Sequence, residues 1–375
     1  MSYVVYAYQL ESAYSIKFLR IQIRFYHFAF AFSFLANIRS AHGQQHDSIQ
    51  YSNQIVRDSF YIKRLDTLLH LQSWVSANRV KYTIVYNSDF KLVLAPNETN
   101  NLSFGFNYRY LDLGISFSPH FMNRAQESDK KGKSEQFSFK TGLSIHRFNV
   151  SVDLSSVKGF YLKNSNDFLR TALPDSPYHI FPELTIGYFS TMIRYNANRK
   201  FSTAALTGGS QVQRRSALTF LPTMQLATYK FHDNSKTTAV HNESTYSTDL
   251  NVILPAAGTL VLSPKFSTSL VAGPSFGVDF FKSVSINDSN KVELSKGTKF
   301  TTGYSIQTAL SYHADRFFAG IESRHRGYGH KIEDISRLIK QYSYFQVYIG
   351  WRLRPPAFAK KSLDWVNKIS PVDFD

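Results

Sequence analysis

The most constraining feature of this chain is a regular alternation of apolar with polar or small residues. After residue 100 it recurs in stretches of about ten residues, each followed by a turn. Examples are 102–108, 111–117, 136–145, 265–280 and 343–353. A period of two places successive side chains on opposite faces of a β-strand. We therefore expect strands whose two faces meet different surroundings.

One short turn predicts both pairing and facing. If His146-Arg147 is a two-residue hairpin turn, Lys140 lies opposite Asp153 on the polar face. The same register places Phe139 opposite Leu154 on the apolar face. A slip by one residue would move the charges to the apolar side, so this register is strongly specified.

Two other hairpins follow from the same reasoning. A turn at Arg109-Tyr110 pairs Tyr108 with Leu111. A four-residue loop over 313–316 is expected to pair Tyr312 with Phe317, Gln307 with Glu322 and Ser305 with Arg324. None of these turns contains Asn-Gly or Asp-Gly, so the predictions depend on alternation more than on turn chemistry.

Composition favours a sheet with an apolar exterior. Aromatic residues make up 15% of the chain, with 32 Phe and 23 Tyr, and there is no cysteine for disulfides or thiolate chemistry. Aromatic side chains on the apolar faces, with small and polar residues opposite, are typical of outer-membrane barrels. An open sheet edge would leave unpaired backbone groups in hydrocarbon. We predict an all-β fold, a closed antiparallel transmembrane β-barrel, with a secreted sandwich or propeller as the alternative.

The strand count contains an inconsistency. Candidate strands number about thirteen, whereas single-chain bacterial barrels have even numbers, so we expect 12 (or 14). The up-and-down order fails between residues 158 and 300, where the candidates include 201–207. The segment 68–86 fits a short helix or a strand equally well.

The N-terminus has the pattern of an export signal. Lys17, Arg20 and Arg24 precede an apolar run over 25–38, and small residues follow at 41–43. The run is shorter than the roughly 20 residues of a spanning helix, which disfavours a retained anchor. We expect a signal peptide with an extended front at 1–43, a periplasmic segment at 44–78, the barrel at 79–354 and a periplasmic tail at 355–375. The predicted location is the bacterial outer membrane.

Several segments together resemble one family. In order along the chain they are Gly105–Arg109, Leu113–Phe117, Lys158–Tyr161, Phe181–Leu184, Asn198–Ser202 and Gln211–Ser216. The chain resembles an uncharacterised outer-membrane barrel family of Bacteroidota-type bacteria, domain of unknown function 4421. The resemblance implies an envelope β-barrel and no known activity, so it assigns no catalytic residue.

The charge pattern indicates the partners. The formal net charge is +16, but the basic residues are dispersed, which argues against nucleic acid. We expect contacts with membrane lipid and lipopolysaccharide headgroups instead. In the tail, Leu363, Val366 and Ile369 recur at helical spacing and predict a short amphipathic helix, a possible contact for a periplasmic partner.

The lumen is the expected functional surface. The inward positions carry charges of both signs, which either brace a filled interior or line a narrow pore. The candidate lumen-lining residues are Lys140, Asp153, Asp249, Asp279, Glu322, Arg324, Arg326 and Arg352. We expect no cofactor, no metal site and no enzymatic activity, and hence a narrow channel or a structural envelope protein.

A lipid-modifying hydrolase or acyltransferase is the alternative among enzymes. Ser311 and His313, and likewise Ser323 and His325, are two residues apart and so share a strand face. By register only Ser323 and His325 would face lipid. A further alternative is a secreted soluble β protein that binds a surface partner.

Overall fold

The computed structural model describes residues 60–86, 91–123, 127–167, 178–207, 209–233, 244–286, 292–332 and 336–369. The expected signal peptide and most of the expected periplasmic segment lie outside the described residues.

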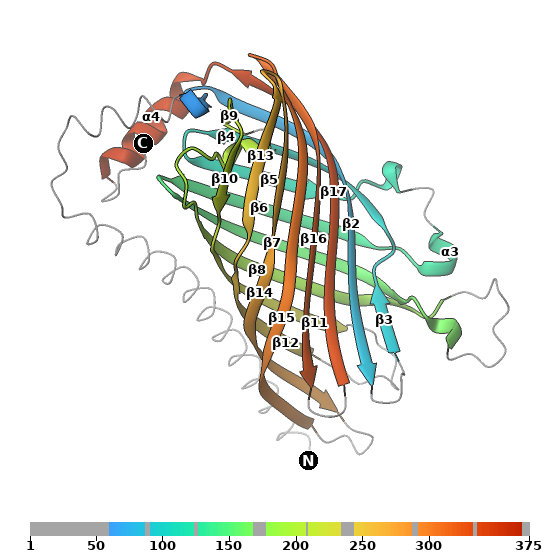
Figure 1. Cartoon of the computed structure of the whole chain (residues 1–375). Helices are drawn as coiled ribbons and strands as arrows, with labels where there is room; N and C mark the ends of the chain where they lie inside the picture. Colours follow the sequence, from blue (N-terminus) through green and yellow to red (C-terminus); the bar gives the residue numbers. More distant parts are fainter. Residues whose placement is uncertain are drawn as a thin grey trace.

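Twelve antiparallel strands form one closed barrel (Figure 1). Each strand pairs with the next one in the chain, and the last pairs with the first. In order they are β2 (Leu69–Tyr86), β4 (Thr99–Tyr108), β5 (Leu111–Phe117), β6 (Glu135–Ile145), β7 (Phe148–Leu162), β8 (Ile180–Tyr195), β11 (Thr223–Asp233), β12 (Ser244–Ile253), β14 (Phe266–Ile286), β15 (Val292–His313), β16 (Phe317–Ile332) and β17 (Ser336–Leu353). The predicted fold class is confirmed, with the lower of the two strand counts.

The strand order distinguishes the two ends of the barrel. The tight turns after β4, β6, β13 and β15 lie at one end, which we call the turn end. The C-terminal helix α4 (Ala357–Ile369) also follows β17 there, whereas α3 (Ser128–Lys131) lies at the opposite, loop end (Figure 1). The loop end also carries the short helical segments η2 (His120–Met122) and η3 (Ser165–Asp167).

Short strands modify the wall at both ends. At the loop end β3 (Lys91–Ala95) pairs with both β2 and β7, so it replaces β4, β5 and β6 in the wall there. The barrel is therefore narrower at that level. At the turn end β10 (Ala217–Phe220) pairs with β13 (Ala256–Ser263). β13 in turn pairs with β14, next to the part of β14 that pairs with β12.

The register predictions have two outcomes. The hairpin around His146-Arg147 is confirmed, with Lys140 opposite Asp153 and Phe139 opposite Leu154. Arg109 and His146 have φ of 53° and 50°, so both turns reach the positive region that Asn-Gly usually supplies.

The third hairpin was predicted with the wrong register. Tyr312 pairs with Ala319, and Gln307 lies opposite Arg324 instead of Glu322. The backbone N–H of Ala314 donates to the carbonyl of Phe317 at 2.8 Å, which closes a two-residue turn instead of a four-residue loop. The shift is two residues, so every side chain keeps its predicted face.

The inconsistent strand count also has a local explanation. Residues 204–207 form a short 3₁₀ helix, η4 (Ala204–Thr207), and not part of a strand. Removing that candidate restores the up-and-down order between residues 158 and 300. The ambiguous segment 68–86 contains β2, so the barrel begins at Leu69, ahead of the expected boundary at residue 79. The alternation is weak in this segment because Trp74, a large apolar residue, lies on the inner face. Its ring lies over Gly105 and Gly114, and a Cβ added at either glycine would stand within 3.2 Å of it.

The outer face of the barrel is apolar and the inner face is polar. Phe276, Phe300 and Phe345 are 44%, 64% and 47% exposed, on strands whose alternate side chains are buried. Asp279 and Glu322, which occupy inward positions, are both 1% exposed. This is the reverse of a soluble sandwich, in which apolar side chains fill the core.

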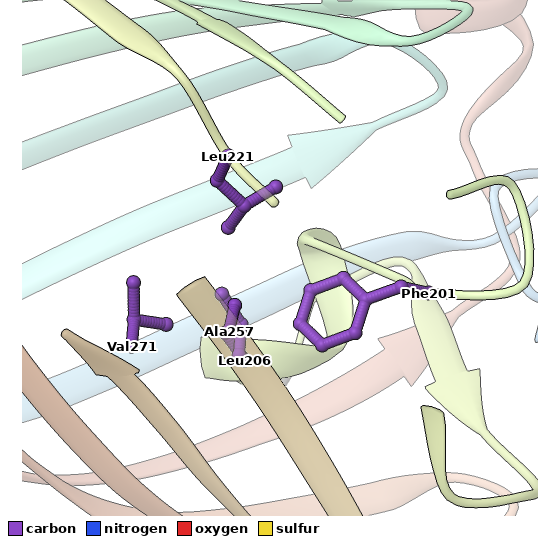
Figure 2. Close-up of a cluster of buried hydrophobic side chains, with 5 residues drawn as sticks. All are labelled: Phe201, Leu206, Leu221, Ala257 and Val271. Atoms are coloured by element: carbon purple, nitrogen blue, oxygen red, sulfur yellow. The ribbon is translucent and has the colours of Figure 1, made fainter. Parts of the chain in front are cut away.

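The connection from β8 to β10 folds back against the barrel mouth. Phe201 and Leu206 from this connection pack with Leu221, Ala257 and Val271 of the wall (Figure 2). The connection also contains β9 (Gln211–Gln213), which pairs with β1 (Ile62–Arg64) from the N-terminal side of the barrel. A plug of local structure thus covers part of the turn end, and we call 196–216 the plug loop.

The predicted amphipathic helix in the tail is confirmed as α4. Arg109 Nη2 in the β4–β5 turn forms a 2.7 Å ion pair with Asp364 Oδ1, which holds the helix beside the barrel. Among the described residues, no helix has the length and apolar character needed to cross a membrane.

Candidate functional site

The residues expected to line the lumen fall into two groups. Lys140, Asp153, Arg324 and Arg326 line one interior cavity. Asp249, Asp279, Glu322 and Arg352 are buried, each at 2% exposure or less. The buried residues lie at three levels: Asp249 and Asp279 toward the loop end, Glu322 beside the cavity, and Arg352 at the turn end.

Toward the loop end, an ionic network crosses the lumen. Lys340 Nζ on β17 donates to Asp249 Oδ2 on β12 at 3.1 Å and lies 3.7 Å from Asp279 Oδ2 on β14. Ser247 Oγ accepts from Lys340 at 2.9 Å and donates to Asp279 Oδ1 at 2.7 Å. Three strands separate β12 from β17 along the wall, so the network spans the interior.

Aromatic side chains close the lumen at the same level. The rings of Tyr82 on β2 and Phe231 on β11 stand 5.2 Å apart edge to face, although these strands lie on opposite sides of the barrel. Tyr229 and Tyr342 stack at 6.5 Å, and Lys340 Nζ lies 4.3 Å from the centroid of the Tyr229 ring. Opposite walls touch here because β3 has replaced three strands. We call these seven residues (Tyr82, Tyr229, Phe231, Asp249, Asp279, Lys340 and Tyr342) the closure.

A cavity of about 430 Å³ lies on the turn-end side of the closure. It extends from Tyr82 and Tyr342 of the closure to Leu206 of the plug loop. Lys140 and Asp153 face each other in it at 3.5 Å. A cavity of this size can hold a small solute or several waters.

Glu322 organises one side of the cavity. Its carboxylate accepts from the Arg324 guanidinium and from Gln307 Nε2 at 2.9 Å. Gln346 Nε2 also donates to it, at 2.5 Å. This buried carboxylate is therefore paired and hydrogen-bonded, as a buried charge requires.

Arg352 lies at the turn end, away from the other candidates. Its Nη1 donates to the Ala314 carbonyl at 2.6 Å, and its guanidinium lies 4.8 Å from the centroid of the Phe318 ring. Its Nη2 lies 3.2 Å from His313 Nδ1. These contacts join the β15–β16 turn to β17, so Arg352 stabilises the turn end of the barrel.

Sequence reasoning missed two important interior residues. Lys340 precedes the expected strand 343–353, yet it continues the inward series of Tyr342, Tyr344 and Gln346. Extending the expected strand by three residues, from 343 to 340, would have found it. Arg194 was missed because both faces of β8 carry apolar residues, so alternation does not distinguish them.

The outer face carries one polar cluster. Ser323 Oγ and His325 Nε2 are 3.0 Å apart, and His325 Nδ1 is 3.0 Å from Ser343 Oγ on β17. Apolar residues of the outer face, including Ile321 and Phe345, surround it. Within the described part of the chain, no group of three or more His, Asp and Glu is placed to hold a metal ion.

The closed ladder and the reversed distribution of polarity define the class of protein, a transmembrane β-barrel of twelve strands. The model of one family, "Domain of unknown function (DUF4421)", matches residues 56–353. The chain belongs to this family, as its sequence segments had indicated.

Solved structures of outer-membrane proteins resemble the fold at low identity. A loop-deletion mutant of OmpT from Vibrio cholerae is 8% identical, with 73% of this chain and 99% of that chain covered and a TM-score of 0.26. The translocator domain of NalP from Neisseria meningitidis is 8% identical over 88% and 98% of the two chains, with a TM-score of 0.26. Ail of Yersinia pestis is 8% identical over 75% and 98%, with a TM-score of 0.18. No curated protein matches. Likenesses this low carry no argument about function.

Proposed function

We propose that this chain is a non-enzymatic barrel of the bacterial outer membrane that serves as a structural envelope component and forms no open pore at rest. The apolar outer face supports the location, because a wide belt of exposed Phe, Leu and Val is stable only against hydrocarbon. The export signal expected at 1–43 is consistent with this location. On this proposal the turn end and α4 face the periplasm.

One observation carries the proposal of a closed interior. Tyr82 and Phe231 touch from strands on opposite sides of the barrel, beside the ionic network of Lys340. A solute would have to displace both the aromatic contacts and a buried ion pair to pass this level. Separating this pair inside the lumen would leave buried charges without their partners, which disfavours opening.

Conductance in planar bilayers tests the closed interior. The folded protein should give no discrete openings, whereas regular single-channel steps would replace this proposal with the narrow channel. A variant with Tyr82→Ala and Phe231→Ala is the positive control. It removes both rings that meet in the closure, so it should show openings that the parent protein lacks.

Fractionation tests the location. The protein should require detergent for extraction and should migrate differently on gels before and after heating. Recovery without detergent would instead support a secreted soluble β protein.

The tail supports a proposal about the lipid partner. Phe358, Trp365 and Ile369 of α4 are 72%, 61% and 58% exposed and fall on one stripe of the helix, while Lys361 and Lys368 flank it. Such a stripe suits an anionic lipid surface. With Trp74 and Trp351 replaced by Phe, fluorescence of Trp365 should be quenched by brominated lipid, and unchanged fluorescence would favour a periplasmic protein partner.

A second candidate function has one specific observation in its favour. Ser323, His325 and Ser343 have the spacing of a nucleophile, a base and a group that orients the base. In this scheme Ser323 Oγ attacks the carbonyl carbon of a lipid ester while His325 takes the hydroxyl proton and passes it to the departing alcohol, and water then releases the fatty acid.

Two features favour the non-enzymatic proposal over the hydrolase. β16 is paired on both sides through this stretch, so its backbone donors are committed to the ladder and are not free to stabilise an oxyanion. The orienting group is a neutral serine. Release of fatty acid from phospholipid vesicles that is abolished by Ser323→Ala but not by Ser311→Ala would establish the hydrolase.

A further inference from the structure

The cavity below the closure contains cations from opposite walls of the barrel. Lys140 on β6, Arg194 on β8, and Arg324 and Arg326 on β16 all line it. β8 and β16 are separated by four strands on one side of the barrel and by six on the other. Arg194 therefore faces β16 across the lumen, and it lies close enough to Arg324 and Arg326 to interact with them electrostatically.

The carboxylates of the cavity are assigned to only two of these cations. Lys140 pairs with Asp153 at 3.5 Å, and Arg324 bonds Glu322. Asp112, the remaining carboxylate, interacts with the same two cations, Lys140 and Arg324. Among the described residues, no carboxylate forms a direct ion pair with Arg194 or Arg326, although Glu322 acts on Arg194 at longer range.

Arg194 and Arg326 have few partners of their own. Arg194 Nε makes one long contact, 3.4 Å to Thr223 Oγ1. Among the residues that the structure describes, none accepts a hydrogen bond from the Arg326 guanidinium or forms an ion pair with it. Each guanidinium presents five N–H donors in a planar fork and cannot lose its charge at physiological pH.

Two unpaired guanidinium groups that face a shared cavity form a site for an anion. Water in the cavity can satisfy their donors but leaves their mutual repulsion, whereas an oxyanion satisfies the donors and neutralises the charge. We propose that the cavity binds a small oxyanion, a phosphate or a carboxylate, between Arg194 and Arg326. Tyr188 and Tyr328, which also line the cavity, provide hydroxyl groups beside it.

This site goes beyond the proposed structural role, because a closed barrel needs no internal ligand. It also does not depend on that role. A barrel that conducts could hold the same anion along its path, so conductance and anion binding are separate measurements.

Calorimetry on the folded protein in detergent tests the site. Inorganic phosphate and succinate are titrated in separate experiments against sodium chloride at matched ionic strength. We expect saturable binding of one anion per chain by at least one probe, and the probe that saturates at the lower concentration identifies the oxyanion class. Arg194→Gln and Arg326→Gln should each weaken that binding by at least about tenfold.

Arg354→Gln is the matched control, because Arg354 is exposed beyond the end of β17. It should leave binding unchanged. Heat-modifiable migration establishes that each variant is folded, and Arg194→Lys, which keeps the charge and loses the fork, provides a milder second variant with intermediate affinity. Absence of saturable binding by both probes, or equal binding by Arg194→Gln and Arg354→Gln, would overturn the proposal.

Discussion

The closure and the cavity occupy the same lumen, yet they handle charge in opposite ways. In the closure, Lys340 is surrounded by Asp249, Asp279 and Ser247, and Lys299 stands opposite Asp279 on the next strand. In the cavity, Arg194 and Arg326 face open space. Polar side chains inside one barrel can therefore serve as internal packing at one level and, on our proposal, as an anion site at another.

The difference follows from the geometry of the wall. At the level of the closure, β3 replaces β4, β5 and β6, so opposite strands approach until Tyr82 meets Phe231. Below it all three strands are present, and the wider cross-section leaves a cavity of about 430 Å³. Charges must pair directly where the barrel is narrow, and they can stay apart where it is wide.

Replacing Lys340 should have the largest effect on stability. Lys340→Met leaves Asp249 buried without its ion-pair partner and removes one of the cations beside Asp279, so we expect a loss of about 3–5 kcal/mol in the free energy of unfolding. Denaturant unfolding of the detergent-solubilised barrel measures it. Adding Asp249→Asn should recover part of the loss, because it removes one of the stranded charges.

An exposed ion pair serves as the control for this variant. Lys158 and Glu183 lie 3.0 Å apart with side chains 45% and 44% exposed. Lys158→Met should therefore cost no more than about 1 kcal/mol. Equal losses for Lys340→Met and Lys158→Met would show that the closure is not a buried ionic network.

The lower boundary of the cavity should depend on packing, not on charge. Leu206 of the plug loop is 2% exposed, and Leu206→Ala should cost about 2–3 kcal/mol through lost burial and the space left behind. Leu218→Ala is the control, since Leu218 on β10 is 77% exposed and its truncation leaves no internal cavity, so it should cost less than Leu206→Ala. Limited proteolysis within 196–216 provides a second readout. Proteolysis that is unchanged in Leu206→Ala would mean that Leu206 does not hold the plug loop.

Sequence reasoning predicted the wall of this barrel well because a wall is a local pattern. The pairing of Lys140 with Asp153 needs only a two-residue turn and a period of two. An even-numbered slip, as between Gln307 and Glu322, preserves the faces, so alternation cannot detect it.

The interior was harder to predict, because its contacts join strands that are distant in the sequence. Tyr82 and Phe231 are brought together by closure of the whole barrel, and no local pattern encodes their distance. Alternation also fails where both faces are apolar, which concealed Arg194 on β8. The plug loop was misassigned for a related reason. Residues 201–207 are apolar enough for a strand, but Phe201 and Leu206 pack into the barrel mouth instead.

The variant with the smallest expected effect on stability, Arg194→Gln, gives the sharpest test of whether the cavity differs from the closure. In anion-free buffer Arg194→Gln removes an unpaired cation, so the free energy of unfolding should change by less than about 1 kcal/mol, in the direction of greater stability. Arg324→Gln should be destabilising, because it leaves the buried carboxylate of Glu322 without its cation. Phosphate or succinate should then stabilise the parent protein more than Arg194→Gln, since the stability that a ligand adds rises with its affinity for the folded state. If Arg194→Gln in anion-free buffer costs as much as Lys340→Met, the two levels of the lumen do not differ, and Arg194 is a bracing residue like those of the closure.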